Sequence, residues 1–275
     1  DEVHAIVGER ADARDVLVGV RGRTDHDERI GGAAQDVPLD DDVHVAPDWV
    51  DTVLRTFGRH PELDCLGGKV LPDWQDPPPR WLTRMHWAPL ALQDFGEAPM
   101  VVSAENPKGL ISANLACRKA LLERIGGFSP KFQRVGAGIG SLEDDEWMRR
   151  LWKAGGRALY VPELVTYTAV PRSRLTRSYH RRWHRGHGGF YALLRAEEME
   201  QSDMGSLLGI PAHMYRAAFA ATAGWLSATA GGRPDEAFMH EVKLCFLRGF
   251  FTRRILGTKL PLSSERMPSH DGNSL

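Results

Sequence analysis

The stretch that most constrains the fold is residues 141–162, SLEDDEWMRRLWKAGGRALYVP, because it predicts a helix, the end of that helix and a strand in immediate succession. Four consecutive acids, residues 143–146, precede a helical pattern in which Trp147 and Trp152 can share one face. A Gly-Gly pair then predicts the helix end, and the β-prone run ALYV closes at Pro162. Acids at a helix N-terminus are favoured by the macrodipole, but four exceed what capping needs. Their mutual repulsion therefore favours a bound cation or a catalytic use.

A second acidic cluster follows a short apolar run near the start of the chain. The residues VPL at 37–39 lead directly into Asp40, Asp41 and Asp42. Ligands of open α/β sheets bind beyond the carboxyl ends of the strands, so we expect these acids at such an edge. An amphipathic helix is predicted next, with an apolar face of Trp49, Val50, Val53, Leu54 and Phe57. The order of strands, helices and acid clusters predicts an α/β core to about residue 168 and a helical extension after it.

Bulk properties limit the compartment and the partners. The net charge of -1 gives no indication of a nucleic-acid partner. The three cysteines, Cys65, Cys117 and Cys245, show neither zinc-ligand spacing nor a disulfide framework, which favours a reducing compartment. We find no apolar run long enough to span a bilayer and no signal peptide, so we expect a cytoplasmic protein.

The two acid clusters suit two different chemical roles. Carboxylates are the natural ligands of Mg²⁺ or Mn²⁺, so the first cluster is predicted to hold a divalent cation and a nucleotide ligand. The second cluster can supply a general base for an acceptor hydroxyl. The metal would stabilise a departing diphosphate by neutralising its charge.

Three blocks carry a resemblance to a known family: LDDDVHVAPDWV, SANLACRKALLERIGGF and LEDDEWMRRLWKAGGRALYVPE. In this order and at these distances they resemble the family 2 glycosyltransferases of the GT-A fold, over residues 17–167. The resemblance implies a Rossmann-like mixed sheet flanked by helices. It also implies metal-dependent, inverting transfer from a nucleotide-diphospho-sugar to a hydroxyl of a polysaccharide or lipid-linked glycan, as in cell-envelope polysaccharide biosynthesis.

The resemblance assigns roles to individual residues. Asp40 and Asp42 match the DxD motif, with Asp42 the better metal ligand, and Asp144 matches the catalytic base of the ED motif, with Glu143 beside it. The segment YHRRW at 179–183 resembles the QxxRW motif of processive members, but Tyr179 stands where Gln is expected, and we do not infer processivity. The residues implied for donor binding are Asp40, Asp41, Asn114, Arg182 and Trp183.

The N-terminal part departs from the family pattern. The segment LVGVRGRTD at 17–25 resembles an altered form of the expected Asp-Asn-Gly-Ser-Thr-Asp element, and only 14 residues separate Asp25 from Asp40. Thr168 also stands where many relatives carry a metal-binding His. We interpret the nucleotide-binding half as truncated or frame-disturbed, or as genuinely divergent. The alternative function is therefore a non-catalytic, transferase-like module that binds carbohydrate or a partner. A metal-dependent phosphohydrolase is disfavoured, because no nucleophile or His pair accompanies the acid clusters.

The chain after the core is basic and helical. Six arginines lie between residues 172 and 185, and no acid lies between Val170 and Ala196. His180 and His184 have the i, i+4 spacing of metal ligands but no third ligand in register, so a basic helix facing phosphate or an anionic membrane is favoured. We expect peripheral contact with the inner face of the membrane, and two further helices over residues 206–230 and 235–255. The predicted domains are a core at 1–168, a helical extension at 169–257 and a polar tail at 258–275.

Overall fold

The computed structural model describes residues 16–19, 43–132, 139, 142–196 and 206–256. The chain divides into two compact units. The sheet unit comprises the chain up to Ser129 together with residues 144–175, and the helical unit comprises residues 130–143 and the chain from Thr176 onward. Each unit is described by itself below.

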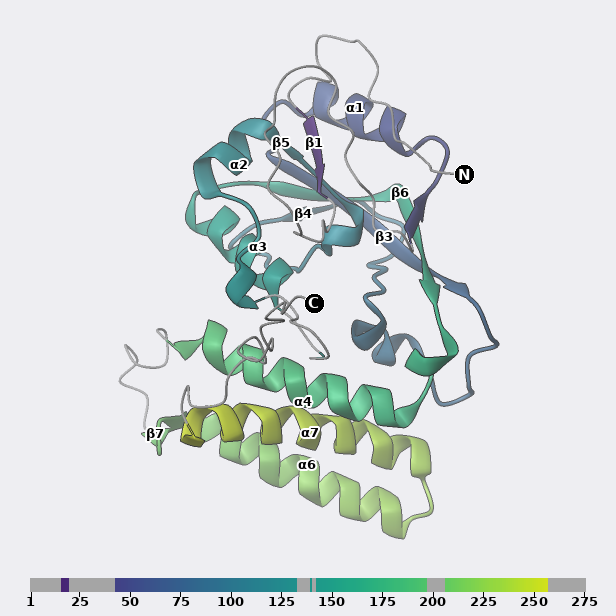
Figure 1. Cartoon of the computed structure of the whole chain (residues 1–275), viewed down its shortest axis with the longest axis vertical. Coiled ribbons are helices and arrows are strands. Elements are labelled where there is room, and N and C mark those ends of the chain that lie inside the picture. The colour runs from purple at the N-terminus through teal and green to yellow at the C-terminus, as the bar shows by residue number, and fades with distance from the viewer. Residues whose placement is uncertain (1–15, 20–42, 133–138, 140–141, 197–205, 257–275) are drawn as a thin grey trace, which may run out of the picture. The chain divides into compact units, whose positions relative to one another are not determined.

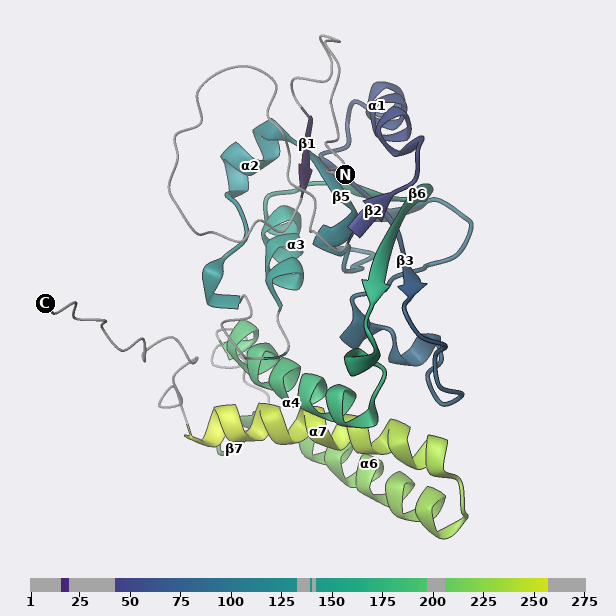
Figure 2. The same ribbon diagram turned by 45° about the vertical axis from the view of Figure 1, so that its right-hand side comes forward.

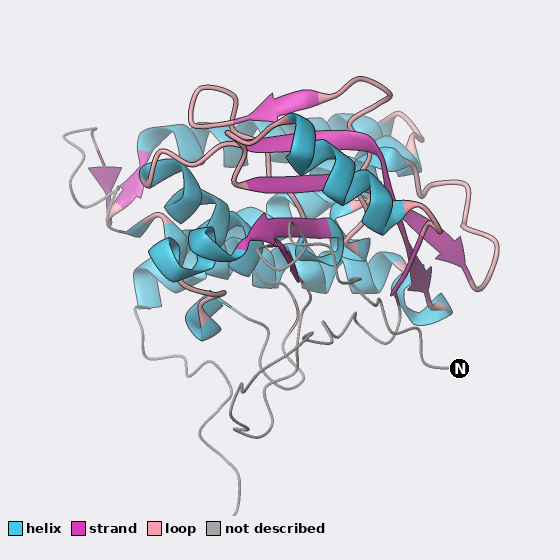
Figure 3. Ribbon diagram, turned by 90° about the horizontal axis from the view of Figure 1, so that it is seen from above, coloured by secondary structure: helices cyan, strands magenta, loops and turns pink. Residues whose placement is uncertain are grey.

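The sheet unit is built on a six-stranded mixed sheet (Figure 1 and Figure 3). The strand order is β1-β5-β3-β6-β2, and β4 also pairs with β6. The central strands β3 and β6 run parallel, and every other pair is antiparallel. The strands are β1 Val16–Gly19, β2 Val43–Val45, β3 Cys65–Trp74, β4 Met100–Val102, β5 Leu115–Arg118 and β6 Ala158–Val170. The predicted GT-A-like mixed sheet flanked by helices is confirmed.

Helices cover both faces of this sheet because alternate strand residues point to opposite faces. On one face, Cys65 and Cys117 pack with the helices α2 Lys119–Ile125 and α3 Glu143–Lys153. On the other face, Leu66 and Ala116 pack against α1 Trp49–Arg59. The predicted apolar side of α1 is confirmed, since Trp49, Val53 and Phe57 are buried in that second cluster.

Strand β6 does not close at Pro162, contrary to the sequence prediction, but continues to Val170. The reason is a bulge. Gly67 of β3 pairs with Tyr160, whereas Lys69 pairs with Val165, so four residues of β6 lie opposite Gly68 alone. Pro162 falls in this bulge, where the missing N–H costs no ladder hydrogen bond. The bulge brings Leu164 O so close that a Cβ on Gly68 would lie 2.0 Å from it, and this position accepts only glycine.

The helical unit contains α4 Arg177–Leu194, α6 Ala212–Ala230 and α7 Pro234–Leu256, with α7 packed between the other two (Figure 1 and Figure 2). Residues 206–211, predicted to be helical, instead form a hairpin of β7 Ser206–Leu207 and β8 Ile210–Pro211. The two-residue turn of Leu208 and Gly209 has φ values of 55° and 69°, which match the type I′ geometry preferred in hairpins. Among the described residues, none of the helices has the length and apolar character needed to cross a membrane.

The arginines of α4 are partly committed to the packing of this unit. Arg181 makes a bidentate pair with Glu241 of α7 at 2.8 and 2.9 Å, and Arg177 pairs with Asp235 at 2.5 Å. Bidentate guanidinium–carboxylate pairs fix geometry as well as charge. These two side chains are therefore held by contacts within the unit, and the prediction of a basic helix facing phosphate or an anionic membrane stays a prediction. Arg182 and Arg185 of the same helix are exposed.

Candidate active site

Asp144 lies in the first turn of α3 and is held by the loop before β5. Its Oδ1 accepts a hydrogen bond from the backbone N–H of Ser112 at 3.2 Å. Ser112 begins the short 3-10 turn η4 Ser112–Asn114, which leads directly into β5. A carboxylate at this position is favoured both by the helix dipole and by the backbone donor. Asp144 is therefore oriented from two sides by the fold.

Asn114, at the end of the same turn, is 2% exposed and ties three elements together. Its Oδ1 accepts from the indole N–H of Trp49 at 2.8 Å, which anchors the start of α1. Its Nδ2 donates to Lys69 O of β3 at 2.7 Å and to Leu164 O in the β6 bulge at 2.8 Å. Both amide protons are used inside the sheet unit, so the side chain acts by positioning the η4 turn.

The other end of α3 is fixed by the Gly-Gly-Phe element that precedes it in the chain. The indole N–H of Trp147 donates to Gly126 O at 3.1 Å, and Arg150 donates to Gly127 O at 2.7 Å. Arg150 also pairs with Glu146 at 2.7 and 2.9 Å. Glu146 is thus a structural partner within α3. This bonding ties the Gly-Gly-Phe block to the acidic helix.

Glu143, the first residue of α3, is 3% exposed. The boundary between the two units falls between it and Asp144. Its carboxyl is thus far more buried than that of Asp144, which is half-buried. The two neighbouring acids therefore have different surroundings, and Asp144 is the more accessible of the two.

The first acid cluster, Asp40, Asp41 and Asp42, lies outside the described residues. Val43, the next residue, begins β2 and pairs with Thr168 of β6. The Thr168 hydroxyl is buried and has no hydrogen-bond partner within the described ranges. The same ranges contain no group of three or more His, Cys, Asp or Glu side chains able to hold a metal ion. The predicted metal ligands therefore remain a prediction.

Arg182 and Trp183 lie on α4, in the helical unit. Trp183 stacks on His187 with ring centroids 4.4 Å apart and an interplanar angle of 15°. Arg182 is exposed. The structure thus joins Asp144 and Asn114 through one turn, while it places Arg182 and Trp183 in the other unit.

An ion pair between a buried lysine and an exposed glutamate in the sheet unit was missed by sequence reasoning. Lys69 is 8% exposed, and its Nζ lies 2.5 Å from Glu97 Oε1. The hydrogen bond with Glu97 raises the pKa of Lys69 against the opposing effect of burial. The Tyr160 hydroxyl, also from the sheet, donates to Gly96 O at 3.1 Å, and burial raises the pKa of Tyr160. The available signal was a lysine within the run CLGGKVL, which is otherwise free of polar side chains.

Comparison with known proteins gives two findings. The sequence profile of the family described as "Glycosyl transferase family group 2" matches residues 37–246. A glucosyl-dolichyl phosphate glucuronosyltransferase of Haloferax volcanii is 24% identical over 98 residues. That match spans 36% of this chain and 30% of the length of the archaeal protein.

Proposed function

The chain belongs to family group 2 of the glycosyltransferases, and from this premise we propose that it moves a sugar from a nucleotide-diphospho-sugar to a hydroxyl of a glycan or lipid-linked acceptor, with inversion and with a divalent metal. The observation that carries the proposal is the placement of Asp144. It combines the first turn of α3, a backbone donor from Ser112 and partial exposure within the family-matched region.

In the proposed reaction, Asp144 acts as the general base. Its carboxylate accepts the proton of the acceptor hydroxyl while the hydroxyl oxygen forms a bond to the anomeric carbon. The bond from that carbon to the diphosphate oxygen breaks, and the nucleoside diphosphate leaves with the electron pair. Attack on the face opposite the leaving group inverts the anomeric centre. The hydrogen bond from Ser112 keeps the carboxylate oriented without neutralising it.

Asp42 and Asp40 are the proposed ligands of Mg²⁺ or Mn²⁺. Their carboxylate chemistry suits these hard cations. When bound, the metal would neutralise charge on the departing diphosphate. Metal binding can be measured without turnover, by the loss of the free Mn²⁺ paramagnetic signal on addition of protein. Asp42→Asn is expected to abolish the titration.

The proposed donor contacts are Asp40 and Asp41 with Arg182 and Trp183, while Asn114 acts by holding the η4 turn. The name of the archaeal relative, a glucuronosyltransferase of glucosyl-dolichyl phosphate, supports a lipid-linked acceptor for this chain too. A lipid-linked acceptor also agrees with a cytoplasmic enzyme that works at the inner face of a membrane.

The base assignment is tested with Asp144→Asn, using Asp145→Asn as the matched control. Both variants remove one negative charge from the same helical turn, so the loss of favourable interaction with the helix dipole is matched. Loss of a general base is expected to lower kcat by about 10²–10⁴-fold, with little change in the affinity for the donor. The control should retain most of its activity. Near wild-type transfer by Asp144→Asn would contradict the assignment.

Calorimetry separates this proposal from a non-catalytic binding module. The full chain is titrated with UDP or GDP in the presence of Mn²⁺. Metal-dependent nucleotide binding together with sugar transfer supports the enzyme. Carbohydrate binding without any nucleotide binding would favour the degenerate module instead.

A further inference from the structure

Helix α6 has an unusual outer surface for a helix in a folded unit. Arg216 is the one residue of this helix that belongs to the charged types Asp, Glu, Lys and Arg. Its inner side is accounted for by Met214, Ala221 and Ala228, which are buried. Large apolar side chains remain on the outside, since Phe219 is 78% exposed and Leu226 is 55% exposed. Exposed apolar surface of this size on one element commonly marks an interaction site.

A second apolar group lies where the β7–β8 hairpin meets the end of α7. At the hairpin tip, Leu207 and Leu208 are 65% and 69% exposed. Arg254 of α7 donates from Nε to Gly209 O at 3.1 Å and so fixes the tip beside the helix end. Ile255 and Leu256, the last residues of α7, are also more than half exposed.

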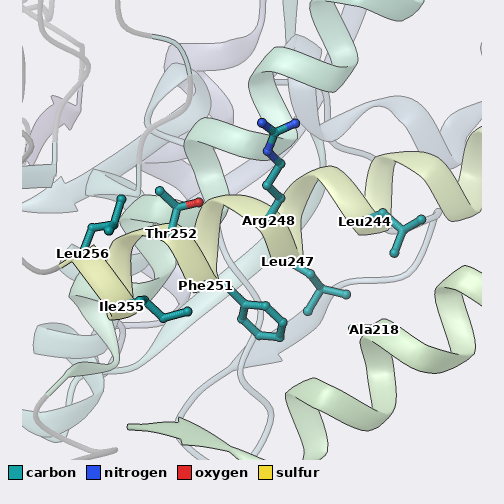
Figure 4. A pocket seen from close by; sticks show the side chains of 8 residues that line it. All are labelled: Ala218, Leu244, Leu247, Arg248, Phe251, Thr252, Ile255 and Leu256. Carbon is teal, nitrogen blue, oxygen red and sulfur yellow. The ribbon is translucent and has the colours of Figure 1, made fainter. Parts of the chain in front are cut away.

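An open groove of about 490 Å³ lies between α6 and the C-terminal part of α7 (Figure 4). It is lined mainly by apolar side chains of α7, with Ala218 contributed by α6. Among the described residues that line it, Arg248 alone is charged. The groove therefore extends the apolar surface at the end of α7 toward α6.

Charge on this surface has one sign. Residues 206–230 and 242–256 contain no Asp or Glu, and their basic side chains include Arg216, Lys243 and Arg248. All three acids of residues 206–256 lie in the early part of α7 and are paired there with arginines. The pairs are Asp235 with Arg177, Glu236 with Arg233, and Glu241 with Arg181.

We propose that the outer surface of α6, the β7–β8 hairpin tip and the C-terminal end of α7 dock together on the surface of an anionic lipid bilayer. An apolar face with basic neighbours suits this occupant, because the side chains enter the acyl boundary while the cations meet the headgroups. A second copy of the chain fits less well. A two-fold contact would bring the same positively charged surface of both copies face to face. The inference does not depend on the catalytic assignment.

The test is co-sedimentation of the full chain with lipid vesicles. Vesicles of phosphatidylcholine alone are compared with vesicles made of phosphatidylcholine and phosphatidylglycerol in equal amounts. The full chain is expected to sediment with the anionic vesicles and to be released by high salt. Equal sedimentation with both vesicles, or with neither, would overturn the proposal.

Variants locate the contact. Phe219→Glu combined with Leu208→Asp is expected to weaken vesicle binding by at least about tenfold. Lys243→Gln with Arg248→Gln is expected to weaken it about 25-fold, roughly fivefold per charge. Met85→Glu is the matched control, because Met85 is 75% exposed in the sheet unit and should leave binding unchanged.

Fold and oligomeric state are measured for every variant. Circular dichroism must show unchanged helix content, so that lost binding reflects the surface and not unfolding. Light scattering distinguishes the alternative occupant. A dimer that becomes monomeric in Phe219→Glu with Leu208→Asp would assign the surface to a second copy and contradict the membrane proposal.

Discussion

The crossing of α4 and α7 depends on two glycines, and their replacement gives a sharp prediction. A Cβ on Gly188 of α4 would lie 2.0 Å from Phe246 O, and a Cβ on Gly249 of α7 would lie 1.9 Å from Arg185 O. Ordinary contact of a Cβ begins at 3.4 Å. The obstructing atoms belong to the helix backbone, so no side-chain rotation relieves the clash. In Gly188→Ala the two helices must separate by more than an ångström.

The magnitude follows from two opposing effects. Overpacking of this kind costs about 3 kcal/mol or more when the backbone has to move. Alanine regains about 1 kcal/mol of helix propensity over glycine. The free energy of unfolding of the helical unit should therefore fall by about 2 kcal/mol. Urea unfolding followed by far-ultraviolet circular dichroism measures this change.

The adjacent Gly189 provides the control. Its Cβ would meet only Gly249 O at 3.9 Å, an ordinary contact. Gly189→Ala should thus gain up to about 1 kcal/mol from propensity alone. Neighbouring substitutions of identical chemistry are expected to change stability in opposite directions. The reasoning is refuted if Gly188→Ala is as stable as the wild type, or if both variants lose stability equally.

Two further predictions concern the sheet unit. Asn114→Leu should lower the free energy of unfolding by more than about 3 kcal/mol. The substitution leaves the Trp49 indole N–H and the buried carbonyls of Lys69 and Leu164 without the hydrogen bonds that Asn114 makes. An unchanged urea midpoint would contradict the positioning role. Burial raises the pKa of the Cys117 thiol from 9.0 to about 12. A raised pKa means that the neutral thiol is favoured in the folded state, so its stabilising effect is complete below pH 9 and is lost between pH 9 and 12. About 1.4 kcal/mol should be lost by about pH 10. Cys117→Ala should lack this part of the alkaline slope, and parallel curves for the two proteins would argue against it.

The sequence predicted those parts of the fold whose signals are local. The apolar side of α1 follows a helical period, and the Gly-Gly pair after residue 125 ends α2 where expected, with Gly126 at a φ of 77°. The three sequence blocks that resemble the family predicted the mixed sheet and the position of Asp144 at the start of α3. Each of these signals lies within a short block of the chain.

The sequence did not predict features that depend on distant partners. Pro162 is compatible with strand β6 only because the bulge opposite Gly68 frees it from the ladder. The residues 206–211 form a hairpin although they are as apolar as the helix that follows. The ion pair of Lys69 with Glu97 joins a strand to a loop far along the chain. None of these pairings produces a periodic pattern in the sequence.

The sequence by itself determined the class of the protein, since the order of acid clusters, Gly-Gly element and helices identifies a family 2 glycosyltransferase core. Tertiary structure alone decided how the second cluster is held. Asp144 receives its hydrogen bond from Ser112 because Asn114 binds Trp49, Lys69 O and Leu164 O at once. The physical reason is that a periodic pattern encodes which face of an element is apolar. It does not encode which distant carbonyl a bulge will present to a buried amide.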